Sequence, residues 1–377
     1  MTDSEPKYQQ VIEWVKDKIV DGSYKPGDRL MSEMELSKMF GLSRQTIRRA
    51  TGELENQNYV TRVQGSGTYI GGSSVQSRQE HYMCIAVIST YYDSYIFPPT
   101  LKGIERILSG SGYSMQVSFT DNKIKREEQI LKDLLERDNI DGLIVEAVKS
   151  SLPNPNIVFY RKFMDMGIPV IFFNSSYPDL PAPCVRLDDM GIAEKATNIL
   201  LQAGHRNVGA ILKLDDGQGR LRYAGYMKAL FKASADFRES QVAWIDSMDY
   251  RDLSAIEEHI FSRMKNVTGV VCYNDEVAYQ LIDLGLKRGL RIPEDLSVVS
   301  IDDSHLAGVS RVPFTSFPHP KDLLGRKAAE NMIRMIDQPE FDGNFLFDCE
   351  PVIRDSVRVL TLEGENGNAR RTEEKSV

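Results

Sequence analysis

The chain has 377 residues, of which 41% are hydrophobic and 27% are charged, and this is enough for two or three domains with real cores. It has no apolar run long enough to span a bilayer, and its N-terminus lacks the basic and apolar regions of a signal peptide, so we expect a cytoplasmic protein without a membrane partner. The four cysteines are far apart and lack metal-ligand spacing, which favours unpaired thiols and no metal site.

The formal net charge of −8 excludes a uniformly basic nucleic-acid-binding protein, but the charge is not evenly distributed along the chain. Residues 1–72 carry five lysines and five arginines against four aspartates and six glutamates. Between residues 41 and 70, four arginines stand against two glutamates. Because attraction to phosphates needs only a local patch, this segment remains a candidate for binding DNA.

Residues 7–20 have apolar side chains at helical spacing, which predicts an amphipathic first helix that begins at Lys7. A second helix is expected to start at Ser32, since Glu35 completes a capping box. Gly41 ends it, and Ser43 caps a third helix. On that third helix the buried stripe is expected to be Ile47, Ala50 or Thr51, and Leu54, while Arg44, Gln45, Arg48 and Arg49 lie on another face.

Guanidinium and amide groups in the first two turns of a helix can meet phosphates or base edges in a major groove. Two short strands, at 59–63 and 68–70, should follow the third helix, and the glycines between them permit a tight tip that approaches DNA closely. The order of these elements predicts a winged helix-turn-helix. The alternative is a small helical domain with a solvated basic face.

This stretch resembles the DNA-binding domain of the GntR family of bacterial regulators. The resemblance covers about seventy residues and is carried by the Pro-Gly-Asp at 26–28, Ser32-Glu33, the segment 43–48 and the Gln-Gly-Ser-Gly-Thr at 64–68. Many members have an arginine where this chain has Met34, so a DNA contact is not carried over to Met34. The DNA-binding residues that the resemblance and the pattern together imply are Lys7, Glu33, Ser43, Arg44, Gln45, Thr46, Arg48, Gln64, Gly65 and Gly67.

After this first domain, at 1–71, a small and polar segment at 72–81 is expected to be a linker, and the polar end at 363–377 a disordered tail. Between them, over 82–362, short apolar runs alternate with amphipathic helical stretches. This alternation predicts parallel sheets covered by helices, and there are too many such units for one small sheet. We therefore expect an α/β domain of two lobes.

Ligands of open α/β sheets bind beyond the carboxyl ends of the strands, so the polar residues that follow each apolar run are candidates. Acceptors, amides and one arginine suit a neutral, polyhydroxylated ligand, and nearby aromatic rings suit the apolar face of a sugar. Any one of these aspartates or asparagines is equally well explained as a helix cap. The candidates are Glu146, Asn174, Asp216, Arg222, Asn274, Asp275, Asp302 and Asp303, with Tyr91, Tyr92, Tyr95 and Phe97 as the aromatic group.

Residues 82–360 resemble the effector domain of LacI/GalR repressors, which is similar to periplasmic sugar-binding proteins. The carriers are the segments 140–145, 273–276 and 292–299, together with Arg222 and Asp302. The family usually has Gly-Tyr-Asp where this chain has Ser-Ile-Asp at 300–302. The resemblance implies an effector site made of Tyr95, Glu146, Asn174, Asp216, Gln218, Arg222, Asn274 and Asp302.

A GntR-type DNA-binding domain joined to a LacI-type effector domain resembles the arabinose repressors of Gram-positive bacteria, and this resemblance implies L-arabinose as effector. We therefore expect a homodimeric repressor that binds a pseudo-palindromic operator and is released by a sugar, with no cofactor, metal or catalytic residue. Another pentose or hexose remains an alternative. Less favoured alternatives are a transport binding protein and a sugar-acting enzyme that uses Asp188-Asp189 or Asp302-Asp303.

Overall fold

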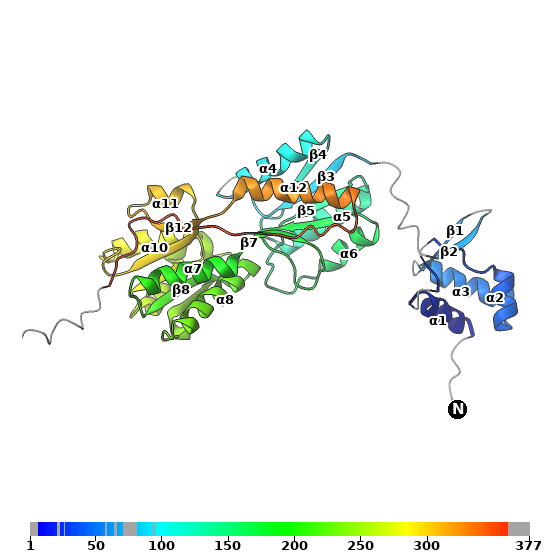
Figure 1. Ribbon diagram of the computed structural model, residues 1–377, viewed down its shortest axis with the longest axis horizontal. Coiled ribbons are helices and arrows are strands. Elements are labelled where there is room, and N and C mark those ends of the chain that lie inside the picture. The colour runs from blue at the N-terminus through cyan, green and yellow to red at the C-terminus, as the bar shows by residue number, and fades with distance from the viewer. Residues whose placement is uncertain are drawn as a thin grey trace, which may run out of the picture. The chain divides into compact units, whose positions relative to one another are not determined.

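The computed structural model describes residues 7–20, 23–25, 27–56, 59–63, 66–70, 81–92 and 95–360 (Figure 1). Apart from Met164–Gly167, the chain divides between His81 and Tyr82 into two compact units. Among the described helices, none has the length and apolarity needed to cross a bilayer.

The first unit is a three-helix domain with a two-stranded wing. Its elements are α1 (Lys7–Val20), α2 (Glu33–Phe40), α3 (Arg44–Asn56), β1 (Val60–Val63) and β2 (Gly67–Ile70), and the strands pair antiparallel. The predicted capping box is confirmed: the Ser32 backbone N–H donates to Glu35 Oε2 at 2.7 Å, and the Ser32 hydroxyl accepts from the Glu35 N–H at 3.3 Å. The expected stripe on α3 is buried against α1 and α2, since Ile47, Ala50, Thr51 and Leu54 are all at most 2% exposed.

The second unit contains two parallel sheets, as the alternating pattern predicted. The N-terminal lobe has a six-stranded sheet in the order β13-β7-β6-β5-β3-β4, and α4 and α12 cover one face while α5 and α6 cover the other (Figure 1). Its strands are β3 (Cys84–Ser89), β4 (Ser114–Phe119), β5 (Gly142–Val145), β6 (Val170–Phe173), β7 (Cys184–Leu187) and β13 (Phe345–Phe347), and its helices are α4 (Phe97–Gly110), α5 (Ile124–Arg137), α6 (Ile157–Asp165) and α12 (Lys321–Asp337).

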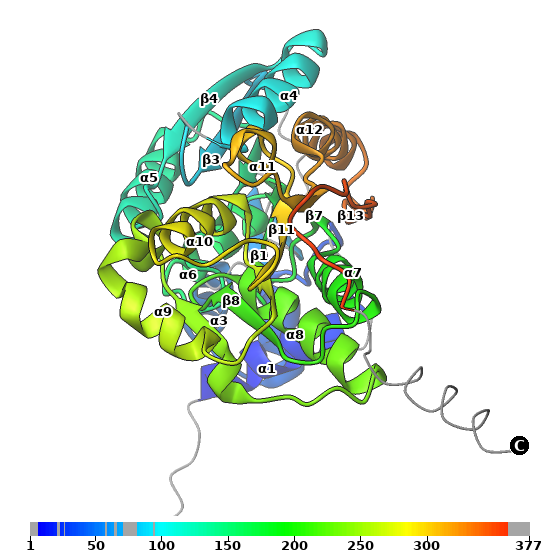
Figure 2. The ribbon, with the colours of Figure 1, turned by 90° about the vertical axis from the view of Figure 1, so that its left-hand side faces the viewer.

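The C-terminal lobe has a five-stranded sheet in the order β12-β11-β10-β8-β9. Figure 2 shows α7 and α8 on one side of this sheet and α9 and α10 on the other. Its strands are β8 (Val208–Lys213), β9 (Val242–Ile245), β10 (Gly269–Cys272), β11 (Ser297–Asp302) and β12 (Thr315–Pro318); its α-helices are α7 (Asp189–Gln202), α8 (Gly217–Lys232), α9 (Glu257–Met264), α10 (Asp275–Lys287) and α11 (His305–Val309), and its 3-10 turns are η1 (Glu239–Gln241), η2 (Asp249–Arg251) and η3 (Leu253–Ile256).

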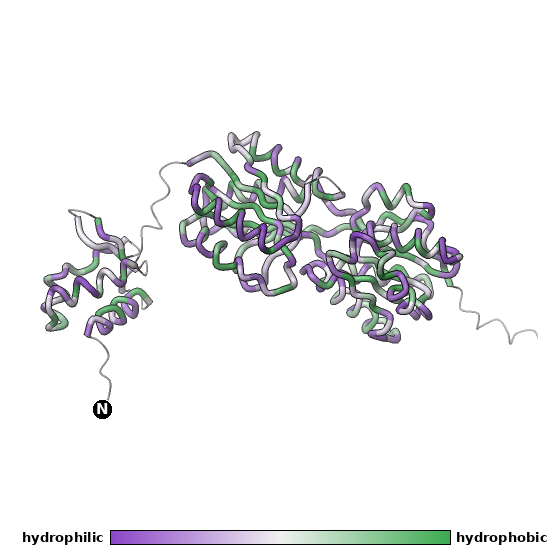
Figure 3. The backbone as a smooth tube through the Cα atoms, turned by 180° about the vertical axis from the view of Figure 1, so that it is seen from behind, coloured by the Kyte–Doolittle hydropathy of each residue, from purple (hydrophilic) through white to green (hydrophobic). Residues whose placement is uncertain are grey.

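The core of each lobe lies between its sheet and its helices. Figure 3 shows that the hydrophobic residues concentrate on the strands and on the inward faces of the helices. Helices α7 and α8 pack closely because Gly225 has no side chain: a Cβ there would lie 2.0 Å from the Met190 carbonyl oxygen. Burial of apolar surface at about 25 cal/mol per Å² is the main stabilising contribution of such cores.

Within the described part of the second unit, the chain passes between the lobes three times, after β7, β12 and β13. These strands are at one edge of their sheets: β13 and β7 in the N-terminal lobe and β12 in the C-terminal lobe. The crossings therefore join the lobes along one side, and the carboxyl ends of the other strands face a cleft.

Candidate functional site

Helix α3 of the first unit displays its polar side chains to solvent. Arg44, Gln45 and Arg48 are exposed, and they follow Ser43, whose hydroxyl accepts from the Thr46 N–H at 3.2 Å. Lys7, at the start of α1, is also exposed. These side chains are accessible to an external partner, as the recognition helix of a DNA-binding domain requires.

Glu33 organises the centre of this face. Arg48 donates to it twice, from Nε at 3.2 Å and from Nη2 at 2.9 Å, and this hydrogen bond from Arg48 lowers the pKa of Glu33. Arg44 Nη2 lies 3.2 Å from Met34 Sδ. The bidentate pair therefore fixes the direction in which the Arg48 guanidinium points.

Arg62 on β1 also belongs to this face, although the sequence pattern assigned it no role. Its Nη2 donates to Thr51 Oγ1 at 2.6 Å and its Nε lies 3.6 Å from Glu55, so it ties the wing to α3. Gly67 has φ of 140°, a conformation that favours glycine, and the Arg29 side chain packs against it. Gln64 and Gly65, which we predicted as contacts, lie outside the described residues.

The second unit has a cavity of about 690 Å³ between its lobes. Asp275, one of the strand-end candidates, does not line this cavity and instead accepts hydrogen bonds from the Ser304 N–H and the Ser316 hydroxyl, but most of the predicted effector residues do line it. Of these, Tyr95, Glu146, Asp216, Gln218, Arg222, Asn274 and Asp302 line the cavity, as do the aromatic residues Tyr91, Tyr92 and Phe97. A volume in the range of a few hundred Å³ is typical of a small-molecule site.

Arg222 is the central cation of this cavity and is 1% exposed. Its Nε donates to Asp189 Oδ1 at 2.8 Å, its Nη1 donates to the Tyr273 carbonyl, and its Nη2 lies 3.7 Å from Asp302 Oδ1. Burial raises the pKa of Asp189 to about 6 although Arg222 opposes this. The charge of Arg222 is thus already balanced by two carboxylates.

Asp302 accepts a hydrogen bond across the cleft from the Tyr95 hydroxyl. Burial raises the pKa of Asp302, and Arg222 and Tyr95 act against that shift. Its other oxygen, Oδ1, is buried without a hydrogen bond, which leaves an acceptor for a ligand hydroxyl. The φ of 107° at Asp302 is backbone strain of a kind that clusters at binding sites.

Glu146 accepts from the Thr90 N–H at 2.9 Å and from the Thr90 hydroxyl, and Asn174 Nδ2 donates to it at 2.8 Å. Asn174 itself is not among the cavity-lining residues. Its Oδ1 lies 3.1 Å from His319 Nε2, on the crossing after β12. The structure therefore places Asn174 behind Glu146, where it orients the carboxylate.

Asp216 and Asn274 both cap helices and line the cavity. Asp216 accepts from the Gly219 N–H at 2.7 Å at the start of α8, and Asn274 accepts from the Val277 N–H at 3.2 Å at the start of α10. Their other polar atoms have protein partners as well: Asp216 Oδ2 accepts from the Tyr273 hydroxyl at 2.6 Å, and Asn274 Nδ2 donates to a tyrosine hydroxyl at 3.0 Å. Each of these residues is therefore a helix cap and also part of the cavity wall, so the two explanations given for it above are compatible.

Several polar residues of the lining were missed, among them Lys213, Tyr250 and Glu276. Lys213 ends the buried strand β8, and its ammonium lies 3.1 Å from Asp216 Oδ2. The Tyr250 hydroxyl donates to Glu276, and burial together with the charge of Asp302 raises the pKa of Glu276 to about 7. Lys213 is the first polar residue after the apolar run that ends at Leu212, so the strand-end rule could have found it.

The adjacent aspartates do not form acid–base pairs. Asp188 caps α7 through the Gly191 N–H at 3.0 Å, whereas Asp189 turns to Arg222. Asp303 pairs with Arg354 at 2.8 Å, away from its neighbour Asp302. Neither pair presents two carboxylates to one ligand, as hydrolysis of a glycosidic bond requires.

Two family models match the chain: "Bacterial regulatory proteins, gntR family" over residues 7–70 and "Periplasmic binding protein-like domain" over residues 197–357. Among solved structures, the fold is similar to the transcriptional regulator CelR–cellobiose complex (TM-score 0.66, 22% identity, 83% of this chain and 90% of that one). It is also similar to the transcription regulator CcpA of Lactococcus lactis (TM-score 0.66, 24% identity, 73% and 99%). The two family models and the fold thus define a bacterial regulatory protein in which a GntR-type DNA-binding domain is followed by a LacI-type domain.

Two curated relatives match almost end to end and carry the name "Arabinose metabolism transcriptional repressor". The protein from Geobacillus stearothermophilus is 32% identical over 94% of this chain and 98% of its own length. The protein from Halalkalibacterium halodurans is 37% identical over 94% and 97%. The chain belongs to this family of repressors, and its relatives are transcriptional regulators rather than enzymes.

Proposed function

We propose that this chain is a homodimeric repressor that binds operator DNA through its first unit and is released when L-arabinose binds between the lobes of its second unit. The observation that carries the proposal is the neutralised polar cavity, in a chain whose relatives are named for arabinose metabolism. The proposed domains are a reader at 1–71, a linker at 72–81, a sensor at 82–362 and a tail at 363–377.

The charges around the cavity favour a neutral, hydroxyl-rich ligand. Arg222 lies close to Asp189 and Asp302, and Lys213 lies 3.6 Å from Asp215 and 3.1 Å from Asp216. Each of these two buried cations therefore lies close to two carboxylates, which disfavours a sugar phosphate or a sugar acid. Carboxylate acceptors and guanidinium donors instead suit adjacent hydroxyls, and the aromatic rings suit the apolar face of a sugar.

The effector contacts in this proposal are the seven candidates that line the cavity, with Lys213 and Glu276 added and Asn174 as a positioning residue for Glu146. The operator contacts are Arg44, Gln45 and Arg48 on α3, with Ser43, Thr46, Glu33 and Lys7 beside them and the tip at 64–67. Two such readers in a dimer would match two half-sites of a pseudo-palindrome.

Linkage gives the test of this function. If sugar and operator favour different arrangements of the sensor, each lowers the affinity for the other by the same factor, typically about five- to 150-fold. Operator binding should be followed by fluorescence anisotropy at rising L-arabinose, and sugar binding by calorimetry with and without operator. Equal factors in the two experiments support the proposal.

The same calorimetry with a panel of pentoses and hexoses tests the effector. Binding of L-arabinose to the wild type with no effect on operator affinity would contradict the mechanism of release. Tighter binding of a different sugar would replace L-arabinose and leave the mechanism of release in place.

A further inference from the structure

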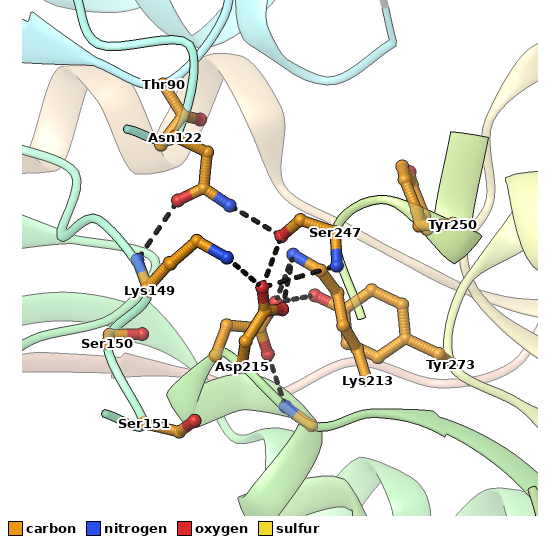
Figure 4. Close-up of polar contacts among 12 residues, drawn as sticks. Thr90, Asn122, Lys149, Ser150, Ser151, Lys213, Asp215, Ser247, Tyr250 and Tyr273 are labelled. Carbon is orange, nitrogen blue, oxygen red and sulfur yellow. Dashed lines mark hydrogen bonds and ion pairs between the residues drawn. The ribbon is translucent and has the colours of Figure 1, made fainter. Parts of the chain in front are cut away.

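The two lobes of the sensor meet at a second place, far from the chain crossings. Asn122 and Lys149 follow β4 and β5 of the N-terminal lobe, and Asp215 and Ser247 follow β8 and β9 of the C-terminal lobe. Figure 4 shows their polar groups pointing at one another, with Asp215 at the centre. We call these four residues the interlobe clasp.

The contacts of the clasp are short and partly buried. Lys149 Nζ donates to Asp215 Oδ2 at 2.8 Å, and the Ser247 hydroxyl donates to the same oxygen at 2.7 Å. Asn122 Nδ2 donates to the Ser247 hydroxyl at 2.8 Å and its Oδ1 accepts from the Lys149 N–H at 3.0 Å. Beside the clasp, the Gly217 N–H donates across the lobes to Ser150 Oγ at 2.8 Å.

The sheet order gives the clasp its position. The crossings lie at the edges formed by β13, β7 and β12, whereas β4 and β9 are the strands at the opposite edges. Asn122 and Ser247 come within three residues of the ends of β4 and β9. The clasp therefore joins the lobes at the end of the cleft that no chain crossing holds, so it must break when the lobes separate there.

Asp215 also reaches the effector cavity indirectly. Its Oδ1 lies 3.6 Å from Lys213 Nζ, and Lys213 lines the cavity. Burial raises the pKa of Asp215, but Lys213, Lys149 and Ser247 outweigh it and hold the pKa below its ordinary value. Asp215 is therefore an anion shared by a cation from each lobe, and it does not itself line the cavity.

We propose that Lys149, Asp215 and Ser247 of the interlobe clasp set the affinity of the sensor for its effector without contacting the effector, by stabilising the closed arrangement of the lobes; the fourth member, Asn122, also lines the cavity. Lys149, Asp215 and Ser247 are positioning residues in this sense. The inference rests on the proposed function and takes the arrangement that sugar favours to be the one with closed lobes. A contact made only in that arrangement adds to sugar affinity and opposes operator binding.

Opposite effects on the two ligands distinguish the clasp from general damage to the fold. Lys149→Met and Ser247→Ala should each weaken L-arabinose binding, by about tenfold for Lys149→Met, which is the effect expected for one charge-assisted hydrogen bond. Operator affinity without sugar should stay the same or become tighter. Lys132→Met is the matched control, because the Lys132–Glu128 pair at 2.6 Å lies within one helix of the same lobe.

Unchanged sugar affinity in both variants would overturn the proposal, and so would a parallel loss of sugar and operator affinity. Hydrogen exchange of the sugar-free full chain tests the clasp separately from the effector. The Gly217 amide should exchange faster in Lys149→Met than in the wild type and in Lys132→Met. Equal exchange rates refute the clasp, whereas a wild type that binds no L-arabinose refutes only the proposed effector.

Discussion

The reader and the sensor use the same residue types in opposite ways. The Arg48 side chain is 67% exposed and pairs with one carboxylate among the described residues, Glu33, whereas the Arg222 side chain is 1% exposed and lies against two carboxylates. A face that meets a polymer has to display its donors, but a pocket for a small molecule has to hold its donors in place before the ligand arrives. The difference in exposure therefore distinguishes a surface for binding DNA from a cavity for enclosing a small molecule.

The energetic consequences differ as well. An exposed ion pair contributes about 0–1 kcal/mol, so the Arg48–Glu33 pair is a way to orient a guanidinium rather than a source of stability. Removing one partner of a buried pair leaves an uncompensated charge in the interior. Substitution of Arg48 should therefore change DNA binding alone, and substitution of Arg222 should change both ligand affinity and stability.

Arg222→Ala should have the largest effect. It removes a charged donor from the cavity, and we expect sugar affinity to fall by roughly ten- to a hundredfold, with the operator bound as in wild type but no longer released. Calorimetry and anisotropy measure the two affinities. Arg220→Ala is the control, since Arg220 lies on the same helix and is exposed. A sugar titration unchanged by Arg222→Ala would show that this arginine only packs α8.

His319 should make the sensor sensitive to acid. Burial, with Lys321 and Arg222 nearby, lowers the pKa of His319 to about 3. The folded state therefore keeps the imidazole neutral while the unfolded chain protonates it below about pH 6.5, so stability present above that pH is lost as the pH falls towards 3. At pH 5 this loss is about 2 kcal/mol.

Urea denaturation of the wild type and of His319→Gln at pH 7 and pH 5 checks this expectation. The glutamine amide can still donate to Asn174 but does not titrate, so the variant should lose about 2 kcal/mol less between the two pH values. The raised pKa values of Asp189 and Asp275, both about 6, contribute with the opposite sign and are common to both proteins. Identical pH dependence in both proteins would contradict the assignment.

Arg48→Ala tests the role of the exposed arginine in the reader. We expect operator affinity to fall by about tenfold while sugar affinity and the urea midpoint stay at wild-type values. Arg49→Ala is the comparison variant, because the Arg49 guanidinium stacks over the Tyr8 ring with its Cζ 4.3 Å from the ring centroid. If Arg48→Ala shifts sugar affinity as well, the two units are coupled through this face.

Ser32→Ala should have the smallest effect. It removes the N-cap of α2, which costs about 1 kcal/mol of stability. The loss should appear in the unfolding of the reader and leave sugar binding unchanged. Circular dichroism on thermal unfolding measures it, and Ser37→Ala on the same helix is a control for loss of a hydroxyl. A change in sugar affinity would show that the reader stabilises the sensor.

The reader was predictable because its signals are local. The cap at Ser32, the turn at Gly41, where φ is 63°, and the stripe on α3 each depend on residues within one helical turn of one another. Arg62 was missed because its partners, Thr51 and Glu55, are brought near by the turn of the chain into the wing. No spacing rule in the sequence connects them.

The sensor was predictable only in outline. Strand ends located Asp216 and Asn274 because parallel strands bring their carboxyl ends to one edge. The same rule could not tell that Asn174 faces Glu146 and His319 rather than the cavity, since that depends on how the crossing after β12 packs. Lys213 was missed because a lysine at the end of a buried strand looks misplaced until Asp215 and Asp216 are seen around it.

The sequence by itself determined the elements, the two-lobed α/β class of the second unit and the residue types at the ends of its strands, because hydrophobic periodicity and capping act over a few residues. Only the tertiary structure decided which of those side chains share a cavity, which carboxylates neutralise Arg222 and Lys213, and that Lys149 meets Asp215 across the cleft. Those pairings join residues as many as 80 positions apart, as Arg222 and Asp302 are, and are set by sheet order and lobe closure. Local spacing contains no information about either.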